Sequence, residues 1–273
     1  MPARFQNFEN TANPALAAPR VASLRALFDA HGISGFLVPR SDEHQGEYVA
    51  KSSERLAWLT GFTGSAGVAL VLKSHAYVFV DGRYTVQAGQ QLDPDVFEIV
   101  DLVASPPAKW LADNAGKAAR IGFDPWLHTI SEVKALEKAL SEAGGTLAPL
   151  PSNLVDAIWQ GRPAAPLEPV SIHDIKQAGL LARDKLAQMA EAVQKANANF
   201  CVLTDPSSIA WAFNIRGKDV PHTPLALCFA ILKAQGEPLL FIDKRKLPIK
   251  TEAYLNQLCT LMPPSALAEE LAR

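Results

Sequence analysis

The 273-residue sequence is poor in cysteine, and it contains neither a long apolar run nor a cluster of positive charge. Its three cysteines, Cys201, Cys228 and Cys259, lie far apart inside apolar segments, which predicts reduced core thiols rather than a disulfide framework or a zinc cluster. No apolar run reaches the roughly 18 residues that a membrane-spanning helix needs. The formal net charge is -2, and no run of Lys or Arg could follow a phosphate backbone. We therefore expect neither a membrane nor a nucleic acid as a partner.

A secretory signal is also lacking. The amino terminus, MPARFQNFENTANP, does not show the charged and then apolar pattern of a signal peptide. This absence, together with the reduced cysteines, predicts a cytoplasmic protein.

The sequence offers no arrangement of residues that could catalyse hydrolysis. A dinuclear metal site needs several carboxylates and at least one imidazole around two ions, but the six histidines are scattered and form neither HExxH nor His-x-His. Asp42 and His44 would face the same side of an extended chain and could clamp a cation, although such an Asp also caps turns. The motif GFTGSAG lacks the spacing and the preceding strand of a nucleophile elbow. We predict no catalytic residue, no metal ligand and no cofactor in this chain.

An internal repeat is the main positive feature of the sequence. The segment LAWLTGFTG at 56–64 recurs as IAWAFNIRG at 209–217, and VFVDGRY at 78–84 recurs as LFIDKRK at 240–246. Two matches in the same order predict a duplicated structural unit.

The spacing of the repeat locates two long loops. The aligned pairs are Phe36 with Phe200, Trp58 with Trp211, and Asp81 with Asp243, and the separation in sequence differs from pair to pair. The first copy thus carries an insertion within 41–53, and the second carries a slightly shorter one within 218–225. Loops longer than their fold requires often bind ligands, so both are candidate sites, with surface decoration as the alternative.

The order of helical and strand patterns predicts the fold class. In each copy a helix precedes an apolar strand, and a further helix and paired strands follow. We predict an α/β protein with two related domains, each a mixed β-sheet flanked by helices on both faces. The proline-rich stretch 161–169 is predicted to link a first domain, 1–160, to a second, 170–273. The first copy continues through more strands and helices, so we expect the second to be truncated at its carboxyl end.

The motif DGRY is the strongest candidate for a binding function. Asp81, at the end of a strand, can cap the following helix, and Arg83 would project as a planar cation suited to a peptide carboxylate or carbonyl. The alternative is that Arg83 pairs with Asp81 or another nearby carboxylate. Trp58 and Trp211 lie among apolar helix residues, which predicts core packing rather than a ligand platform.

Six segments together resemble a known family. SDEHQGEYVA, RLAWLTGFTGSAG, VDGRYTVQA, IGFDPWLHT, NLVDAIWQGRP and IAWAFNIRGKDVPHTP, in this order, closely resemble the two amino-terminal domains of three-domain Xaa-Pro aminopeptidases (aminopeptidase P). The resemblance implies a creatinase-type amino-terminal domain and a second domain of related fold. It also implies a following pita-bread catalytic domain with two divalent metal ions, usually manganese, and this chain does not contain that domain.

The resemblance further implies roles for particular residues. Arg83 would lie near the substrate cleft and bind the peptide, while His44, Tyr84, Arg216 and His222 would make cleft or interdomain contacts. The intact protein would be a homodimer that removes the first residue from short peptides with proline second. We therefore predict the non-catalytic amino-terminal portion of such an enzyme, inactive alone, which shapes substrate access and subunit contacts. The alternatives are a stand-alone peptide- or protein-binding module and a creatinase relative, which fits the motifs poorly.

Overall fold

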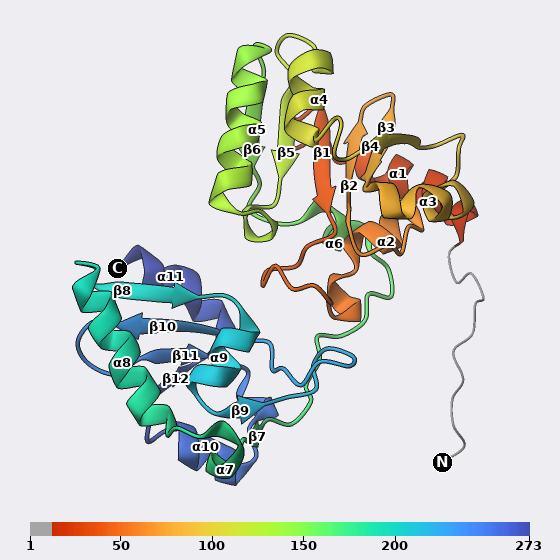
Figure 1. Ribbon diagram of the computed structural model, residues 1–273. Coiled ribbons are helices and arrows are strands. Elements are labelled where there is room, and N and C mark those ends of the chain that lie inside the picture. Colours follow the sequence, from red (N-terminus) through yellow and green to blue (C-terminus); the bar gives the residue numbers. More distant parts are fainter. Residues whose placement is uncertain (1–12) are drawn as a thin grey trace, which may run out of the picture. The chain divides into compact units, whose positions relative to one another are not determined.

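The computed structural model describes residues 13–273, which fall into two compact units (Figure 1). Unit 1 comprises Met1–Asp42 and Ser53–Pro163, and unit 2 comprises Glu43–Ser52 and Ala164–Arg273. These borders differ from the predicted ones, because 43–52 and most of the proline-rich stretch group with unit 2. The segment 1–12, for which we predicted no targeting signal, lies outside the described residues. Within 13–273, no helix is both long and apolar enough to cross a membrane.

Unit 1 is built on a six-stranded mixed sheet in the order β4-β3-β2-β1-β5-β6. The strands are β1 (Gly35–Pro39), β2 (Gly67–Leu72), β3 (Ala76–Val80), β4 (Glu98–Asp101), β5 (Arg120–Phe123) and β6 (Thr146–Pro149). The pairs β1–β2 and β2–β3 are antiparallel, whereas β3–β4, β1–β5 and β5–β6 are parallel.

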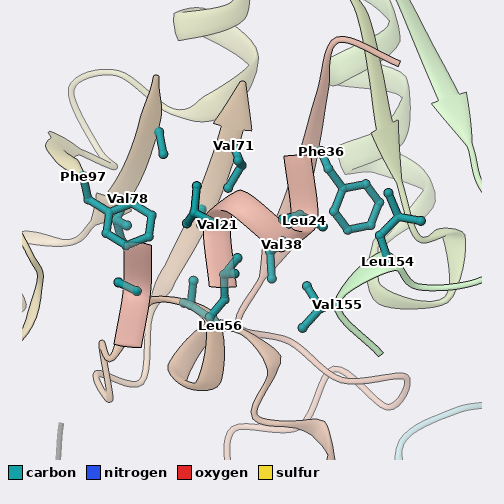
Figure 2. Packing of buried hydrophobic residues seen from close by; sticks show 14 of the residues in the cluster. Val21, Leu24, Phe36, Val38, Leu56, Val71, Val78, Phe97, Leu154 and Val155 are labelled. Carbon is teal, nitrogen blue, oxygen red and sulfur yellow. The ribbon is translucent and has the colours of Figure 1, made fainter. Parts of the chain in front are cut away.

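Helices cover both faces of this sheet. The helices are α1 (Ala17–Arg25), α2 (Arg55–Thr60), α3 (Thr85–Gln91), α4 (Pro107–Asn114), α5 (Ile130–Glu142) and α6 (Leu154–Ile158), with 3-10 turns at Pro14–Leu16, Gly82–Tyr84 and Pro125–Leu127. Of a further 3-10 turn, Lys51–Ser53, only the last residue belongs to unit 1. On one face, residues of α1, α2 and α6 pack on Phe36 and Val38 of β1 (Figure 2). On the other, α4 and α5 pack on Leu37. Both faces of β1 are therefore buried, which explains its unbroken apolar sequence.

Unit 2 contains a four-stranded sheet in the order β12-β11-β10-β8 and a two-stranded sheet of β7 and β9. The strands are β7 (Ser171–Ile172), β8 (Phe200–Leu203), β9 (Ile215–Arg216), β10 (Phe229–Lys233), β11 (Leu239–Phe241) and β12 (Thr260–Met262). The helices are α7 (Ile175–Ala178), α8 (Ala182–Lys195), α9 (Pro206–Ala212), α10 (Ile249–Leu255) and α11 (Leu267–Ala272), with 3-10 turns at Lys244–Lys246 and Pro264–Ala266. Residues of α8, α9 and α10 cover one face of the larger sheet, and Leu267 of α11 packs on the other.

The two units share a topology, which confirms the duplicated α/β fold. The order β4-β3-β2-β1 in unit 1 corresponds to β12-β11-β10-β8 in unit 2, and corresponding pairs run in the same relative directions. The ends of α2 and α9 also correspond, since the aligned residues Gly61 (φ 86°) and Asn214 (φ 50°) both adopt left-handed backbone conformations. Among the described residues, unit 2 has no counterparts of β5 and β6.

The strand ladders correct the predicted alignment of β1 with β8. Val38 lies opposite Ala69, and Leu203 lies opposite Ala230. On the other side of each alanine, Ala69 pairs with a residue of β3, and Ala230 pairs with the residue of β11 that the repeat aligns with it. Val38 therefore matches Leu203, and by the same register Phe36 matches Cys201, so the predicted match of Phe36 with Phe200 was wrong by one position. Such a slip reverses the face of every side chain. It also means that the insertion in the first copy is one position longer than predicted.

Several local predictions were wrong because tertiary context overrode composition. Cys201 is exposed, whereas the other two cysteines are buried as predicted. Trp211 is 50% exposed, with the Lys185 ammonium 4.4 Å from its ring centroid, so it is not a core residue. Trp58 does pack against the unit 1 core and stacks on Trp159. The helix α2 begins after Glu54 without a side-chain cap.

Candidate functional site

The DGRY motif forms a tight turn directly after β3. Asp81 is the N-cap of the 3-10 turn Gly82–Tyr84, and its carboxylate accepts the backbone N–H of Arg83 at 2.8 Å. The Arg83 side chain folds back and donates from Nε and Nη2 to the two carboxylate oxygens at 2.9 and 3.0 Å. The predicted alternative for Arg83, pairing with Asp81, is thus what the structure contains.

This pairing leaves Arg83 accessible and fixes its direction. Its side chain is 70% exposed, compared with 24% for Asp81. The side-chain and backbone hydrogen bonds from Arg83 lower the pKa of the Asp81 carboxyl, so the pair stays ionised at neutral pH. A bidentate pair holds the guanidinium plane in one orientation. The arrangement therefore presents a directed, solvent-accessible cation that can meet a carboxylate or a carbonyl oxygen.

Tyr84 connects the DGRY turn to the GFTGS turn that follows α2. Its hydroxyl lies 2.5 Å from the Ser65 hydroxyl, and its ring packs edge-on against Phe62. The Arg83 guanidinium carbon lies 5.4 Å from the centre of the same ring, within the range of a cation–π contact. Tyr84 is therefore a support for Arg83 and a clamp between two turns.

A second connection holds the GFTGS turn in place. The buried Gln91 of α3 accepts the backbone N–H of Thr63 at 2.9 Å and donates from Nε2 to the Thr63 hydroxyl, also at 2.9 Å. A Cβ atom on Gly64 would lie 2.2 Å from the Phe62 ring, so only glycine fits at this close approach. The surface around Arg83 is thus built on hydrogen-bonded turns rather than on a long loop.

Unit 2 repeats the turn without the tyrosine. Asp243 caps the 3-10 turn Lys244–Lys246, and Arg245 forms the same paired hydrogen bonds with it. The hydrogen bonds from the Arg245 side chain and backbone lower the pKa of Asp243 to about 2. At the position of Tyr84, unit 2 has Lys246, which is buried and bonded to Asp219 at 2.7 Å. Both units therefore contain the Asp–Arg pair, but the residues around the pair differ between the two units.

The buried pair of Lys246 and Asp219 fixes the long loop of the second copy. Asp219 also accepts the backbone N–H groups of Leu227 and Glu168, and Lys246 donates to the Leu227 carbonyl. His222 lies in this loop, exposed and with a left-handed backbone (φ 60°). The loop is held at its base while its tip faces solvent.

Arg216 and His44 lie in unit 2 on different elements. Arg216 donates from Nη1 to the carbonyls of Ala210 and Ile215, so it holds α9 against β9. His44 stacks on Phe229 with ring centroids 4.3 Å apart, and its Nδ1 lies 2.9 Å from the Thr204 carbonyl. Of the five predicted site residues, Arg83 and Tyr84 lie in contact in unit 1, and the other three belong to unit 2. Roles for His44, Arg216 and His222 as interdomain contacts stay predictions.

The described residues, 13–273, contain no group of three or more His, Cys, Asp or Glu side chains that could hold a metal ion. His128 is a partly buried histidine of unit 1. Burial lowers the pKa of its imidazole, against the opposing influence of Glu132 and Asp124, and its buried Nε2 has no hydrogen-bond partner in the described part of the chain.

Sequence reasoning missed the supporting residues of both turns. Ser65, Gln91 and Asp219 were not singled out, although each makes a contact that fixes a turn or loop. The clearest sequence signal for these supporting residues was Lys246. The repeat aligns this lysine with an aromatic residue of unit 1 that packs against the core. A lysine at a buried position requires a partner, which predicts an acidic residue nearby.

Comparison with known proteins identifies both units. The profile of the Creatinase/Prolidase N-terminal domain matches residues 20–158, and a second profile with the same description matches residues 161–273. A probable Xaa-Pro aminopeptidase P of Ajellomyces capsulatus (strain G186AR) is 35% identical over 260 residues, or 94% of this chain and 42% of the relative. Aminopeptidase P1 of Lotus japonicus is 35% identical over 240 residues, or 87% of this chain and 36% of the relative.

A solved structure extends the likeness to three dimensions. The X-prolyl aminopeptidase of Caenorhabditis elegans, a cytosolic enzyme with a di-nuclear active site, superposes with a TM-score of 0.88 and 30% identity. The match covers 93% of this chain and 43% of that one, so the chain spans less than half the length of the relatives it matches. One profile alone covers half of the chain, and the second covers most of the remainder. The chain belongs to the creatinase/prolidase N-terminal domain family, with one such domain in each of its two units.

Proposed function

We propose that this chain is the amino-terminal, non-catalytic portion of a metal-dependent Xaa-Pro aminopeptidase, which removes the first residue from short peptides with proline second. The observation that carries the proposal is the succession of two creatinase-type domains, aligned along 94% of the chain with aminopeptidases more than twice its length. The remainder of the longer protein would hold two divalent ions, which we expect to be manganese. The longer protein would act in the cytoplasm as a homodimer.

Within that protein, Arg83 would bind the peptide. Its guanidinium is exposed, its plane is fixed by Asp81, and Tyr84 supports it from one side. A peptide carboxylate or carbonyl approaching this surface would gain a charge-assisted hydrogen bond without a large cost in side-chain entropy, because the arginine is already ordered. The creatinase-type domains would restrict the cleft so that short peptides enter.

The other predicted contacts would join the two units to the rest of the protein. We propose that His44, Arg216 and His222 serve as interdomain contacts rather than in chemistry. This assignment agrees with their local bonds, since Arg216 and His44 are each anchored to backbone carbonyls and His222 lies at a loop tip.

The test uses the longer protein, loaded with manganese, and an Xaa-Pro-Xaa tripeptide. Arg83→Gln should lower kcat/KM by roughly 10- to 100-fold, which corresponds to the loss of one hydrogen bond to a charged group of about 1.5–3 kcal/mol. Arg83→Lys should recover part of the loss. Arg245→Gln is the matched control, because it removes the same pair from the other unit and should leave kcat/KM within twofold. Unchanged kinetics in Arg83→Gln would refute the role of Arg83.

Two further measurements test the assignment to a longer enzyme. The 273-residue chain, given manganese and the same tripeptide, should release no amino acid, and metal-dependent turnover that survives repurification would refute the non-catalytic assignment. In source cells, an antibody against this region should detect a protein of roughly twice 29.4 kDa or more. A mass near that of the chain itself would instead favour a stand-alone peptide- or protein-binding module.

A further inference from the structure

Three helices that cover one face of the unit 1 sheet also form a pocket on their solvent side. The inner sides of α1, α2 and α6 pack on the sheet, with Val21 and Leu56 among the buried residues (Figure 2). Along the turn and helix at 14–25, a neighbouring stripe of Leu16, Arg20 and Ser23 recurs at helical spacing and lines the pocket. One stripe therefore supports the core while the other is available to a ligand.

The pocket is small and combines apolar walls with polar groups. It has a volume of about 320 Å³, and all of its lining residues belong to unit 1. The apolar part of the lining includes Leu16, Pro19 and Ile158, and the polar part includes Arg20 and Gln160. A space at the small end of the range of ligand pockets suits a compact organic molecule with one polar end.

Two contacts with Trp58 hold Arg20 in the wall of the pocket. Arg20 donates from Nη1 to the Trp58 carbonyl, and its guanidinium carbon lies 4.5 Å from the centre of the Trp58 ring. The Trp58 ring in turn stacks on Trp159, with the ring centroids 5.3 Å apart. A ligand in the pocket therefore meets a cation that is already ordered, which lowers the entropic cost of binding.

A second arginine beside the same pair of rings shows what Arg20 lacks. The guanidinium carbon of Arg162 lies 5.6 Å from the centre of the Trp159 ring, and its Nη1 lies 2.6 Å from the Asp156 carboxylate. Within 13–273, Arg20 has no acidic partner, and its only hydrogen-bond acceptor is the Trp58 carbonyl. Of these two arginines on the tryptophan pair, one is neutralised by the protein and the other is not.

The electrostatics of Arg20 agree with this difference. Burial lowers the pKa of the Arg20 guanidinium, and no carboxylate of the described residues counteracts the shift. In Arg245, by contrast, the hydrogen bond and the charge of Asp243 raise the pKa of the guanidinium. An anion in the pocket would supply to Arg20 what Asp243 supplies to Arg245.

We propose that this pocket binds a small organic carboxylate. The Nε and Nη2 groups of Arg20 pair with the two carboxylate oxygens, and the exposed Gln160 amide donates a further hydrogen bond. The apolar body of the ligand contacts Leu16, Pro19 and Ile158. A single guanidinium balances one negative charge, which favours a carboxylate over a doubly charged phosphate monoester.

This site goes beyond the proposed function, because it lies within unit 1 and requires no catalytic domain. The alternative is that Arg20 only links α1 to α2 through Trp58. A purely structural link predicts that changes at Arg20 lower stability without affecting the binding of any ligand. Binding and stability must therefore be measured separately.

The experiment titrates the 273-residue chain with 3-phenylpropionate and with its neutral amide, and follows the five tryptophan indole N–H signals by NMR. The Trp58 signal, assigned with Trp58→Phe, should shift with the carboxylate, and the amide should bind about tenfold more weakly or less. Arg20→Gln should weaken binding of the carboxylate by about tenfold or more, and Arg20→Lys should recover part of the loss.

Arg25→Gln is the matched control. Arg25 lies on the same helix and donates to the Leu72 carbonyl at 2.8 Å, but it does not line the pocket. The affinity for 3-phenylpropionate should therefore stay within about twofold of that of the unchanged chain. Urea unfolding of each variant gives the accompanying change in stability.

Gln160→Glu tests the pocket without removing any contact of Arg20. Gln160 is exposed, so the variant should fold, and the added carboxylate should compete with the ligand for Arg20 and weaken binding by about tenfold. Gln160→Leu removes the amide without adding charge and should weaken binding only about two- to threefold. The peptide acetyl-Ala-Phe distinguishes two sources of the carboxylate: affinity equal to that of 3-phenylpropionate supports a free small acid, and clearly tighter binding supports the carboxyl end of a peptide.

Four results would overturn the proposal. They are the absence of a saturable shift, equal affinity for the acid and its amide, shifts at other indoles while the Trp58 signal stays in place, and unchanged affinity in folded Arg20→Gln and Gln160→Glu. Because these titrations use only the 273-residue chain, the kinetics of Arg83→Gln in the longer protein decide the proposed function independently.

Discussion

Removing one partner of the buried ion pair between Lys246 and Asp219 should cost several times more stability than breaking the exposed pair of Arg245 and Asp243. The side chains of Lys246 and Asp219 are 7% and 0% exposed, and Asp219 also accepts two backbone N–H groups. Lys246→Met keeps most of the side-chain volume but leaves a buried carboxylate without a cation. Removing one partner of a buried pair typically costs about 3–5 kcal/mol. Arg245→Gln breaks a pair whose side chains are 71% and 27% exposed, so it should cost about 1 kcal/mol or less.

Urea unfolding monitored at Cys228 and Cys259 measures these costs in unit 2 alone, because unit 1 contains no cysteine. With a urea dependence of about 2 kcal/mol per M, Lys246→Met should lower the midpoint for thiol alkylation by about 2 M, or abolish protection without urea. The double variant Lys246→Met with Asp219→Leu should recover much of the loss, since no charge is then buried unpaired. Equal midpoints for Lys246→Met and Arg245→Gln would refute the argument from burial.

Three further predictions follow from burial and protonation. Phe36→Ala should destabilise unit 1 by about 3–5 kcal/mol, whereas Phe200→Ala should cost unit 2 about 1 kcal/mol or less, as measured by urea unfolding. Similar costs would contradict the difference in burial between the two phenylalanines. The pKa of Asp243, about 2 in the folded protein, should rise toward its ordinary value near 4 in Arg245→Gln, as followed by carboxyl NMR; its stabilisation is present above pH 4 and is lost as the pH falls toward 2. Because burial lowers the pKa of His128, protonation favours the unfolded state, and unit 1 should lose stability as the pH falls below about 6.5; His128→Gln should flatten this dependence in urea titrations at pH 7 and pH 5.

The duplicated fold could be predicted because its signals are local. The repeat places Asp81 and Asp243 at the ends of equivalent strands, and both cap the turns that follow. The strand and helix patterns recur in the same order, which specified the fold class. The alignment of β1 with β8 failed because sequence similarity weighs Phe36 and Phe200 as identical residues, while pairing between strands decides which face each side chain occupies.

The failures at Cys201 and Trp211 have a common cause. Each lies in an apolar segment, so composition predicts burial, but burial also requires a neighbouring element to cover the residue. The counterpart of Cys201 is covered because β5 pairs beside it, and β8 has no such neighbour among the described residues. The sequence pattern of one segment does not show whether a neighbouring element covers that segment. Comparison with the other copy of the repeat does show it.

The repeat also separates the structural role of the Asp–Arg pair from any binding role of Arg83. Because Arg245 makes the same hydrogen bonds with Asp243 in a unit that lacks the tyrosine, the pair itself is a device for capping a turn. A role in peptide binding must therefore depend on what differs between the copies. In unit 1 that difference is Tyr84, which supports the guanidinium and bonds to a second turn, whereas unit 2 has a buried lysine at the same position. The comparison of Arg83 with Arg245 consequently measures binding with the cost of losing the side-chain Asp–Arg pair already subtracted.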